Sequence, residues 1–168
     1  MKFEFSAGGI VLRHAQDFGS KPQFSKKKTE VLLCQHSQHH GWVFPKGLIG
    51  DHVKDETKSA SAKGFGETKE EAAIREVKEE TGVIGKILKP LTPVTYWYVF
   101  EKDPSAGSGQ EKIKKTVYFF LMEYIAGDTK DHDFEMENVE WLPVDEVEKR
   151  LTYKSDKQVW QEAKKLVV

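Results

Sequence analysis

The stretch GETKEEAAIREVKEETGV, residues 66–83, decides the fold of this chain, because it predicts one complete helix. Thr68 is a good N-cap, and Glu71 three residues later completes a capping box. Gly82 is the natural residue to end the helix. Between these ends stand mostly strong helix formers. The helix therefore has its own start and stop signals.

The predicted helix has two different sides at about 100° per residue. One side would face a core and carries Ala73, Ile74 and Val77. The other side carries three carboxylates: Glu76, Glu79 and Glu80. Like charges four residues apart cost about 0.2–0.5 kcal/mol in an isolated helix. A divalent cation such as Mg²⁺ or Mn²⁺ would remove that repulsion. The alternative is a solvated charged face.

The order of the residues resembles a known signature. Glu67, then seven residues, then REVKEETGV at 75–83 resembles the Nudix box of the Nudix hydrolases. The resemblance implies an α/β fold, the Nudix α/β/α sandwich with a mixed β-sheet. It also implies hydrolysis of a phosphoanhydride by water, with bound Mg²⁺ or, as an alternative, Mn²⁺, in a substrate that contains a nucleoside diphosphate.

The resemblance also implies roles for individual residues. The metal ligands would be the three helix carboxylates and the backbone carbonyl of Gly47. Glu79 is also a candidate general base. Glu67 and Arg75 would form the structural ion pair of the family, or an ordinary surface salt bridge worth about 0–1 kcal/mol.

A second candidate base is Glu135, which lies in an acidic loop six residues before Trp141. Nudix enzymes often supply a late carboxylate from such a loop. The alternative is that this loop is only a solvated acidic segment.

The N-terminal part of the motif differs from the pattern of the Nudix box. The family glycine would stand at position 61, where this chain has Ser61. Gly47, in the run WVFPKG at 42–47, is the better candidate. The polar segment at about 48–65 would then be an insertion, predicted to form a loop, within a single domain spanning residues 1–168.

Five residues are candidates for binding substrate: Lys46, Lys115, Tyr98, Tyr118 and His40. All but Tyr118 resemble positions in hydrolases of dinucleoside polyphosphates, which makes diadenosine tetraphosphate the expected substrate. Tyr118 is a second candidate for stacking on a base. Base stacking on an aromatic ring is worth about 1–3 kcal/mol. For each tyrosine, a plain role in the sheet is the alternative.

Other functions remain open within this resemblance. The chain could act on a nucleoside diphosphate sugar such as ADP-ribose, on a nucleoside triphosphate, or on the 5′ end of RNA. A fold that only binds nucleotides, without catalysis, is a further alternative. The intact REVKEETG run argues against that last reading.

The composition of the chain limits the classes of binding partner that we expect. The chain has 168 residues, of which 38% are hydrophobic and 32% charged, with a net charge of −1. Such a balance gives no global attraction to nucleic acid or to an anionic membrane. The single cysteine, Cys34, and the lack of a signal peptide favour the cytoplasm. The expected partner is a small nucleotide, and the sequence is silent on oligomeric state.

The remaining elements follow from local patterns. Strands are predicted at residues 3–14, 30–36, 42–44, 84–88, 92–101, 115–125 and 139–142, and helices at 144–151 and 156–167. The first two strands would form a hairpin, and the strand at 115–125 would be central.

Overall fold

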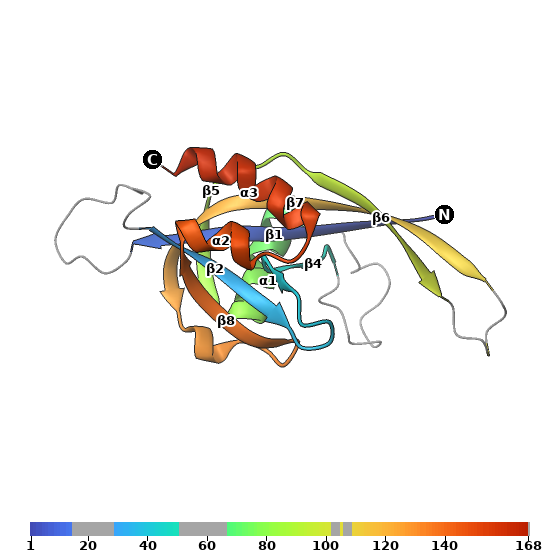
Figure 1. The fold of residues 1–168 in the computed structure, drawn as a ribbon, viewed down its shortest axis with the longest axis horizontal. Coiled ribbons are helices and arrows are strands. Elements are labelled where there is room, and N and C mark those ends of the chain that lie inside the picture. Colours follow the sequence, from blue (N-terminus) through green and yellow to red (C-terminus); the bar gives the residue numbers. More distant parts are fainter. Residues whose placement is uncertain (15–28, 51–66, 102–104, 106–108, 168) are drawn as a thin grey trace.

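A single mixed sheet forms the centre of the molecule, with helices on both faces (Figure 1). The computed structural model describes residues 1–14, 29–50, 67–101, 105 and 109–167. The strands are β1 (Lys2–His14), β2 (Thr29–His36), β3 (Trp42–Val43), β4 (Lys46–Leu48), β5 (Val83–Pro90), β6 (Val94–Glu101), β7 (Gln110–Gly127) and β8 (Met136–Pro143). The helices are α1 (Lys69–Thr81), α2 (Val144–Arg150) and α3 (Lys154–Leu166), with one 3-10 turn, η3 (Thr129–Asp131).

Five of the strands run in the order β3-β2-β1-β7-β5. Of the others, β4 pairs with β1, β6 with β7, and β8 with β2. The predicted hairpin is confirmed, because β1 and β2 pair antiparallel. β1 and β7 pair in parallel, from Lys2 opposite Ile113 to Leu12 opposite Glu123.

Strand alternation sends the apolar side chains of the sheet into two cores. Helix α1 covers one core, which includes Val11 and Met122. Helices α2 and α3 cover the other, where Ile10 and Leu12 meet Trp160. The predicted α/β/α sandwich with a mixed sheet is confirmed.

Several boundaries differ from the sequence prediction, and two of these differences concern β7 and the predicted insertion. Strand β7 has 18 residues and is longer at both ends than the segment 115–125. It gains this length because it pairs with β1 over residues 113–123, with β6 over residues 110–117 and with β5 over residues 120–127. The predicted insertion at about 48–65 starts too early, since Leu48 ends β4 and the Ile49 N–H donates to the Phe5 carbonyl at 3.0 Å. Residues 51–65 of that insertion lie outside the described residues.

Among the residues that the model describes, no helix is long and apolar enough to cross a membrane.

Candidate active site

Helix α1 carries the candidate site, and its ends are as predicted. The Thr68 hydroxyl accepts a hydrogen bond from the Glu71 N–H at 3.1 Å. Gly82 ends the helix at φ 76°, a conformation that favours glycine, and its N–H donates to the Lys78 carbonyl. Ala73 and Val77 are fully buried against the sheet. This packing fixes which way the carboxylates face.

The three helix carboxylates lie in different surroundings. Glu76 and Glu80 are buried, at 7% and 5% exposure, whereas Glu79 is exposed. The alternative of a solvated charged face is therefore wrong for Glu76 and Glu80. Burial raises the pKa of Glu76 to about 7, against the opposing effect of Arg75. Burial and the neighbouring Glu76 raise the pKa of Glu80 well above its usual value.

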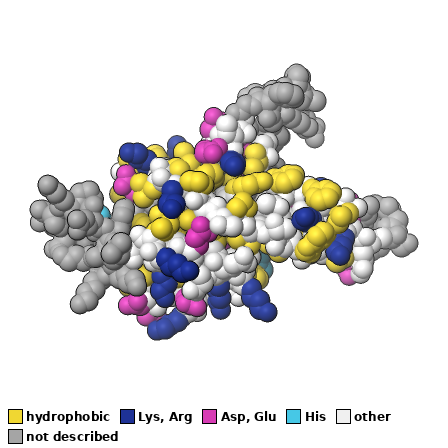
Figure 2. Space-filling model, turned by 90° about the horizontal axis from the view of Figure 1, so that it is seen from above, with side chains coloured by type: hydrophobic (Ala, Val, Ile, Leu, Met, Phe, Trp, Pro, Cys, Tyr) yellow, Lys and Arg dark blue, Asp and Glu magenta, His cyan; other side chains and the backbone are white. Residues whose placement is uncertain are grey.

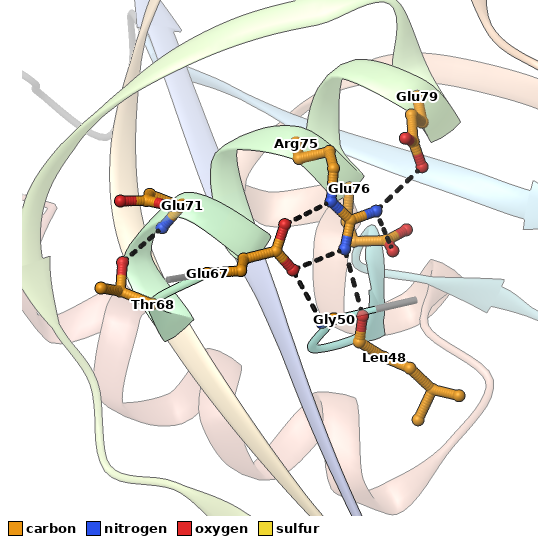
Figure 3. Close-up of polar contacts among 8 residues, drawn as sticks. All are labelled: Leu48, Gly50, Glu67, Thr68, Glu71, Arg75, Glu76 and Glu79. Atoms are coloured by element: carbon orange, nitrogen blue, oxygen red, sulfur yellow. Dashed lines mark hydrogen bonds and ion pairs between the residues drawn. The ribbon is translucent and has the colours of Figure 1, made fainter. Parts of the chain in front are cut away.

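Arg75 links the carboxylates (Figure 3). Its Nε and Nη2 donate to the two carboxylate oxygens of Glu67 at 2.8 and 3.0 Å. Its Nη1 donates to Glu76 at 2.7 Å and to Glu79 at 3.2 Å. Nη2 also reaches the Leu48 carbonyl at 3.1 Å, which ties the helix to the end of β4. The Glu67–Arg75 ion pair is a partly buried fork, with side chains 7% and 19% exposed, and not an ordinary surface pair.

Strand β4 brings the backbone of the WVFPKG run onto these carboxylates. The Lys46 N–H donates to Glu80 Oε2 at 3.0 Å. Gly47 lies directly against Glu76, so that a Cβ on Gly47 would overlap its carboxylate. The Gly9 N–H donates to the Pro45 carbonyl at 3.1 Å and holds the run on β1. Glycine at position 47 is thus a steric requirement of the site.

The donor set suits a hard divalent cation. The available ligands are the carboxylates of α1 and the carbonyl of Gly47, which are all oxygens. The close approach of Gly47 to Glu76 is what a shared cation would require. In the described residues, no three carboxylate, imidazole or thiol groups converge into a formed metal cluster. The carboxylates have other partners in this structure. Arg75 donates hydrogen bonds to Glu76 and Glu79, and the Lys46 N–H donates to Glu80.

A cavity of about 810 Å³ opens above these groups. It is lined by four groups of residues. Helix α1 contributes Arg75, Glu76, Glu79 and Glu80. The acidic loop and the first residue of β8 contribute Asp133, Glu135 and Met136. Strands β2 to β4 and the turn between them contribute His36, His39, Val43, Phe44, Lys46, Gly47 and Leu48. The other wall is Tyr96, Lys115, Tyr153, Lys154, Ser155 and Asp156. Most of the predicted site residues therefore share one space.

Two of the lysines that line this cavity, Lys46 and Lys115, have shifted pKa values. Burial lowers the pKa of Lys46, but Asp156, Tyr96 and Glu80 outweigh that effect and the pKa is raised. Burial and the nearby Lys46 lower the pKa of Lys115. The repulsion between the two ammonium groups would be relieved by an anionic ligand.

Asp156 is a site residue that sequence reasoning missed. It is 2% exposed, and its Oδ1 accepts from the Phe44 N–H at 3.1 Å. Burial raises its pKa, whereas Lys46 and the Phe44 hydrogen bond lower it. The signal available in the sequence was a carboxylate in the first turn of a helix, three and four residues before the apolar Val159 and Trp160. That pattern is equally typical of an acidic residue that only stabilises the positive end of the helix dipole.

A second missed group joins the turn after β2 to the start of α3. The His36 and His39 rings stack with centroids 4.2 Å apart. His39 Nδ1 contacts the Tyr153 hydroxyl at 2.9 Å and accepts from the Gly41 N–H at 3.0 Å. A Cβ on Gly41 would overlap the His39 ring and the Tyr153 ring. This explains why a glycine stands between the histidines and Trp42. Burial, His36 and Lys46 lower the pKa of His39 and favour a neutral ring.

The acidic loop before β8 reaches the same cavity. The Asp133 N–H donates to the Glu79 carbonyl at 3.0 Å and fixes the loop on the end of α1. Asp133 Oδ1 in turn accepts from the Glu135 N–H at 3.1 Å. Burial raises the pKa of Asp133. Asp133 and Glu135 thus line the cavity, and the loop is not simply a solvated segment.

Three predicted substrate residues lie elsewhere. Tyr98 does not line the cavity, and its hydroxyl donates to Glu4 at 2.7 Å. Tyr118 packs beside the α1 core, with the Lys69 ammonium 4.9 Å from its ring centre. His40 contacts Glu137 at 2.7 Å. Tyr96, two residues before Tyr98 on the same face of β6, occupies the cavity wall instead.

The geometry can be compared with known proteins. The model of one protein family, the NUDIX domain, matches residues 23–163. The chain belongs to the NUDIX domain family.

Two mycobacterial relatives have names that describe a function. The putative mutator protein MutT4 of Mycobacterium tuberculosis is 33% identical over 98% of this chain and 56% of its own length. The 8-oxo-(d)GTP phosphatase of Mycolicibacterium smegmatis is 27% identical over 92% of this chain and 39% of its own length. The chain spans about half or less of the length of these relatives.

A solved structure supports the fold. The NUDIX domain of Shewanella oneidensis NrtR, crystallised with ADP ribose, has a TM-score of 0.61 at 19% identity, covering 100% of this chain and 90% of that one. At this identity the likeness concerns the NUDIX fold alone.

Proposed function

We propose that this chain is a divalent-metal-dependent hydrolase that cleaves a phosphoanhydride bond in a nucleoside polyphosphate. The observation that carries the proposal is the meeting of two charge clusters in one cavity. The carboxylates of α1 would hold a cation, and Lys46 and Lys115 would neutralise phosphates beside it. A polyphosphate with its metal ion relieves the repulsion in both clusters.

The residues have separate roles in this proposal. When bound, Mg²⁺ would supply charge neutralisation of the phosphate oxygens and a more acidic water. Glu76, Glu79, Glu80 and the Gly47 carbonyl would hold it. Arg75 fixes the orientation of Glu76 and Glu79 through its hydrogen bonds. Glu79, the exposed member, or Glu135 across the cavity would take the proton from the attacking water.

The first candidate substrate is a dinucleoside polyphosphate. Diadenosine tetraphosphate would be split asymmetrically into ATP and AMP. Its long phosphate chain would use both lysines, whereas a sugar-linked diphosphate would leave one of them without a phosphate. Tyr96 offers an aromatic face in the same cavity. The similarity of the PKG run and of Lys115 to dinucleoside polyphosphate hydrolases supports this choice.

The second candidate is an oxidised purine nucleoside triphosphate. It is favoured by the relative described as an 8-oxo-(d)GTP phosphatase. Asp156 and the Tyr153–His39 pair line the cavity with polar groups that could contact a base. A triphosphate also engages both lysines, so the phosphate-binding residues do not separate the two candidates.

A substrate panel tests the proposal. Diadenosine tetraphosphate, 8-oxo-dGTP, dGTP, ADP-ribose and a 5′-triphosphorylated RNA would each be incubated with Mg²⁺, and the products identified by mass. We expect one of the first two to be cleaved with the highest kcat/KM. Glu79→Gln should nearly abolish turnover with the fold intact, and Glu70→Gln in the first turn of α1 is the matched control. Full activity in excess chelator, or no turnover of any panel member, would overturn the proposal.

A further inference from the structure

Part of the sheet projects as an arm beyond the three helices (Figure 1). The arm consists of residues 2–5 of β1, residues 110–116 of β7 and strand β6. Its inner face contributes Tyr96 and Lys115 to the cavity. Its outer face is the one that continues into the α1 side of the sheet.

The strand registers show which side chains share the outer face. Strand β7 lies between β1 and β6, so partners in register stand in rows across the arm. The first row is Phe3–Lys114–Trp97, and the second is Phe5–Thr116–Thr95. Val99 lies beside Lys112 in the same way. Aromatic and basic side chains therefore alternate across this face.

The outer face is open to solvent. Phe3, Phe5, Trp97 and Val99 are 55%, 50%, 48% and 54% exposed. Figure 2 shows hydrophobic and basic side chains next to each other on the part of the molecule that projects at the right. Contiguous apolar patches on a protein surface are typical of binding sites.

Positive charge lies in the middle of this surface and not at its rim. The ammonium groups of Lys112 and Lys114 are 4.8 and 5.3 Å from the centre of the Trp97 ring. Lys69 lies over Tyr118 farther along the same side of the sheet. Glu101 is the acidic residue on this face of β6, at the far end of the arm.

We propose that the outer face of the arm binds a single-stranded nucleic acid. Bases would stack on Phe3, Phe5 and Trp97, and phosphates would pair with Lys112 and Lys114. Phe3 and Phe5 are two residues apart on one strand, or about 6.6 Å, a step that an extended nucleic acid strand can span. Stacking on aromatic side chains with a basic groove beside them is the usual chemistry of such sites. The net charge of −1 does not oppose this, because the attraction is local.

Two other occupants fit the surface less well. A symmetric pair of copies would place the same patch on both partners, so the lysines of one copy would face those of the other. An anionic membrane would have to accept lysines at the centre of the aromatic patch. A phosphodiester strand supplies both rings and anions at these positions.

The test measures binding of a fluorescein-labelled 20-nucleotide poly(U) with a 5′-hydroxyl end, which gives the catalytic cavity no 5′ polyphosphate. Fluorescence anisotropy would be recorded over a range of salt concentrations. Trp97→Ala should weaken binding on the order of tenfold to a hundredfold. The double variant Lys112→Gln/Lys114→Gln should reduce the slope of log K against log salt by about 1.4.

Matched controls lie on the same molecule. Phe100→Ala changes an aromatic residue that is 55% exposed on the opposite face of β6. Lys86→Gln/Lys149→Gln removes two exposed lysines away from the arm. Both should bind as the wild type does, and circular dichroism would confirm that every variant is folded.

Several results would overturn the inference. Absence of binding at 150 mM salt is one, and equal loss in Phe100→Ala and Trp97→Ala is another. Vesicles of phosphatidylserine and phosphatidylcholine, and sedimentation velocity, test the other occupants. Trp97-dependent binding to the vesicles in place of the oligonucleotide, or a dimer that Trp97→Ala dissociates, would each assign the surface differently. Because the oligonucleotide carries no cleavable anhydride, these outcomes are independent of the proposed hydrolase activity.

Discussion

Gly47 lies so close to Glu76 that any side chain on Gly47 would overlap the Glu76 carboxylate. The two residues come from β4 and α1, and Arg75 holds both elements through Leu48 and Glu76. The spacing between this backbone and this carboxylate is therefore set by packing on both sides. It leaves no room for a methyl group on Gly47.

We expect Gly47→Ala to raise the Mg²⁺ concentration needed for half-maximal activity at least about tenfold, because the Glu76 carboxylate must move. Metal titrations of the reaction rate would measure this. Gly109→Ala is the control, since a Cβ there meets nothing within 4 Å. Equal metal dependence in both variants would contradict a shared role of Gly47 and Glu76.

The Glu67–Arg75 fork should be important for stability. Glu67→Gln leaves Arg75 without its bidentate partner, and breaking a buried ion pair costs about 3–5 kcal/mol. Urea denaturation would measure the free energy of unfolding. Arg150→Ala, which removes an exposed pair with Glu140 at 2.8 Å, should cost only about 0–1 kcal/mol. Similar losses of unfolding free energy in the two variants would show that burial of the Glu67–Arg75 pair does not add to stability.

Without metal, stability should fall as the pH rises. Folding raises the pKa of Glu76 from 4.5 to about 7, so the folded state binds more protons between these values. Stability is therefore highest below pH 4.5 for this group and is lost as the pH rises through about 7. In chelator at pH 8, Glu76→Gln should be more stable than the wild type by on the order of 1–3 kcal/mol.

Thermal melts over pH 5–8 would check this dependence. Added Mg²⁺ should raise the Tm of the wild type at pH 8 more than that of Glu76→Gln, because the ion binds the folded state. A flat pH profile for the wild type in chelator would show that Glu76 is not a strained carboxylate.

The two tyrosines of β6 should differ in their effect on catalysis. Tyr96 lines the cavity, whereas Tyr98 contacts Glu4 outside it. We expect Tyr96→Ala to lower kcat/KM on the cleaved nucleotide by the equivalent of about 1–3 kcal/mol, the range of a lost stacking contact. Tyr98→Ala should have a smaller effect. Steady-state kinetics would decide, and a larger loss in Tyr98→Ala would restore the role first predicted for that residue.

Local signals explain what the sequence could predict. The caps at Thr68 and Gly82 act within one turn of their own helix, so they are readable without the fold. The core-facing side of α1 follows from a period of 3.6 residues. The burial of Glu76 and Glu80 could not be predicted from the sequence, because it depends on strand β4 packing against helix α1.

Contacts between distant residues explain what the sequence could not predict. Asp156 contacts the backbone of Phe44 across 112 residues of chain. The choice of Tyr96 over Tyr98 depends on how far β6 runs before it leaves the cavity, and both residues lie on the same face. A pattern of alternation fixes the face of a strand but not the position along it.

The parallel pairing of β1 with β7 also determines when the central sheet can fold. Lys2 lies opposite Ile113 and Leu12 opposite Glu123, so each contact closes more than a hundred residues of chain. Closing such long loops makes folding slow compared with local hairpins and helices. During synthesis, β1 leaves the ribosome long before its central partner exists. Until β7 emerges, the apolar residues of β1 can pair only with β2 and β4, and during this interval the nascent chain is most exposed to aggregation.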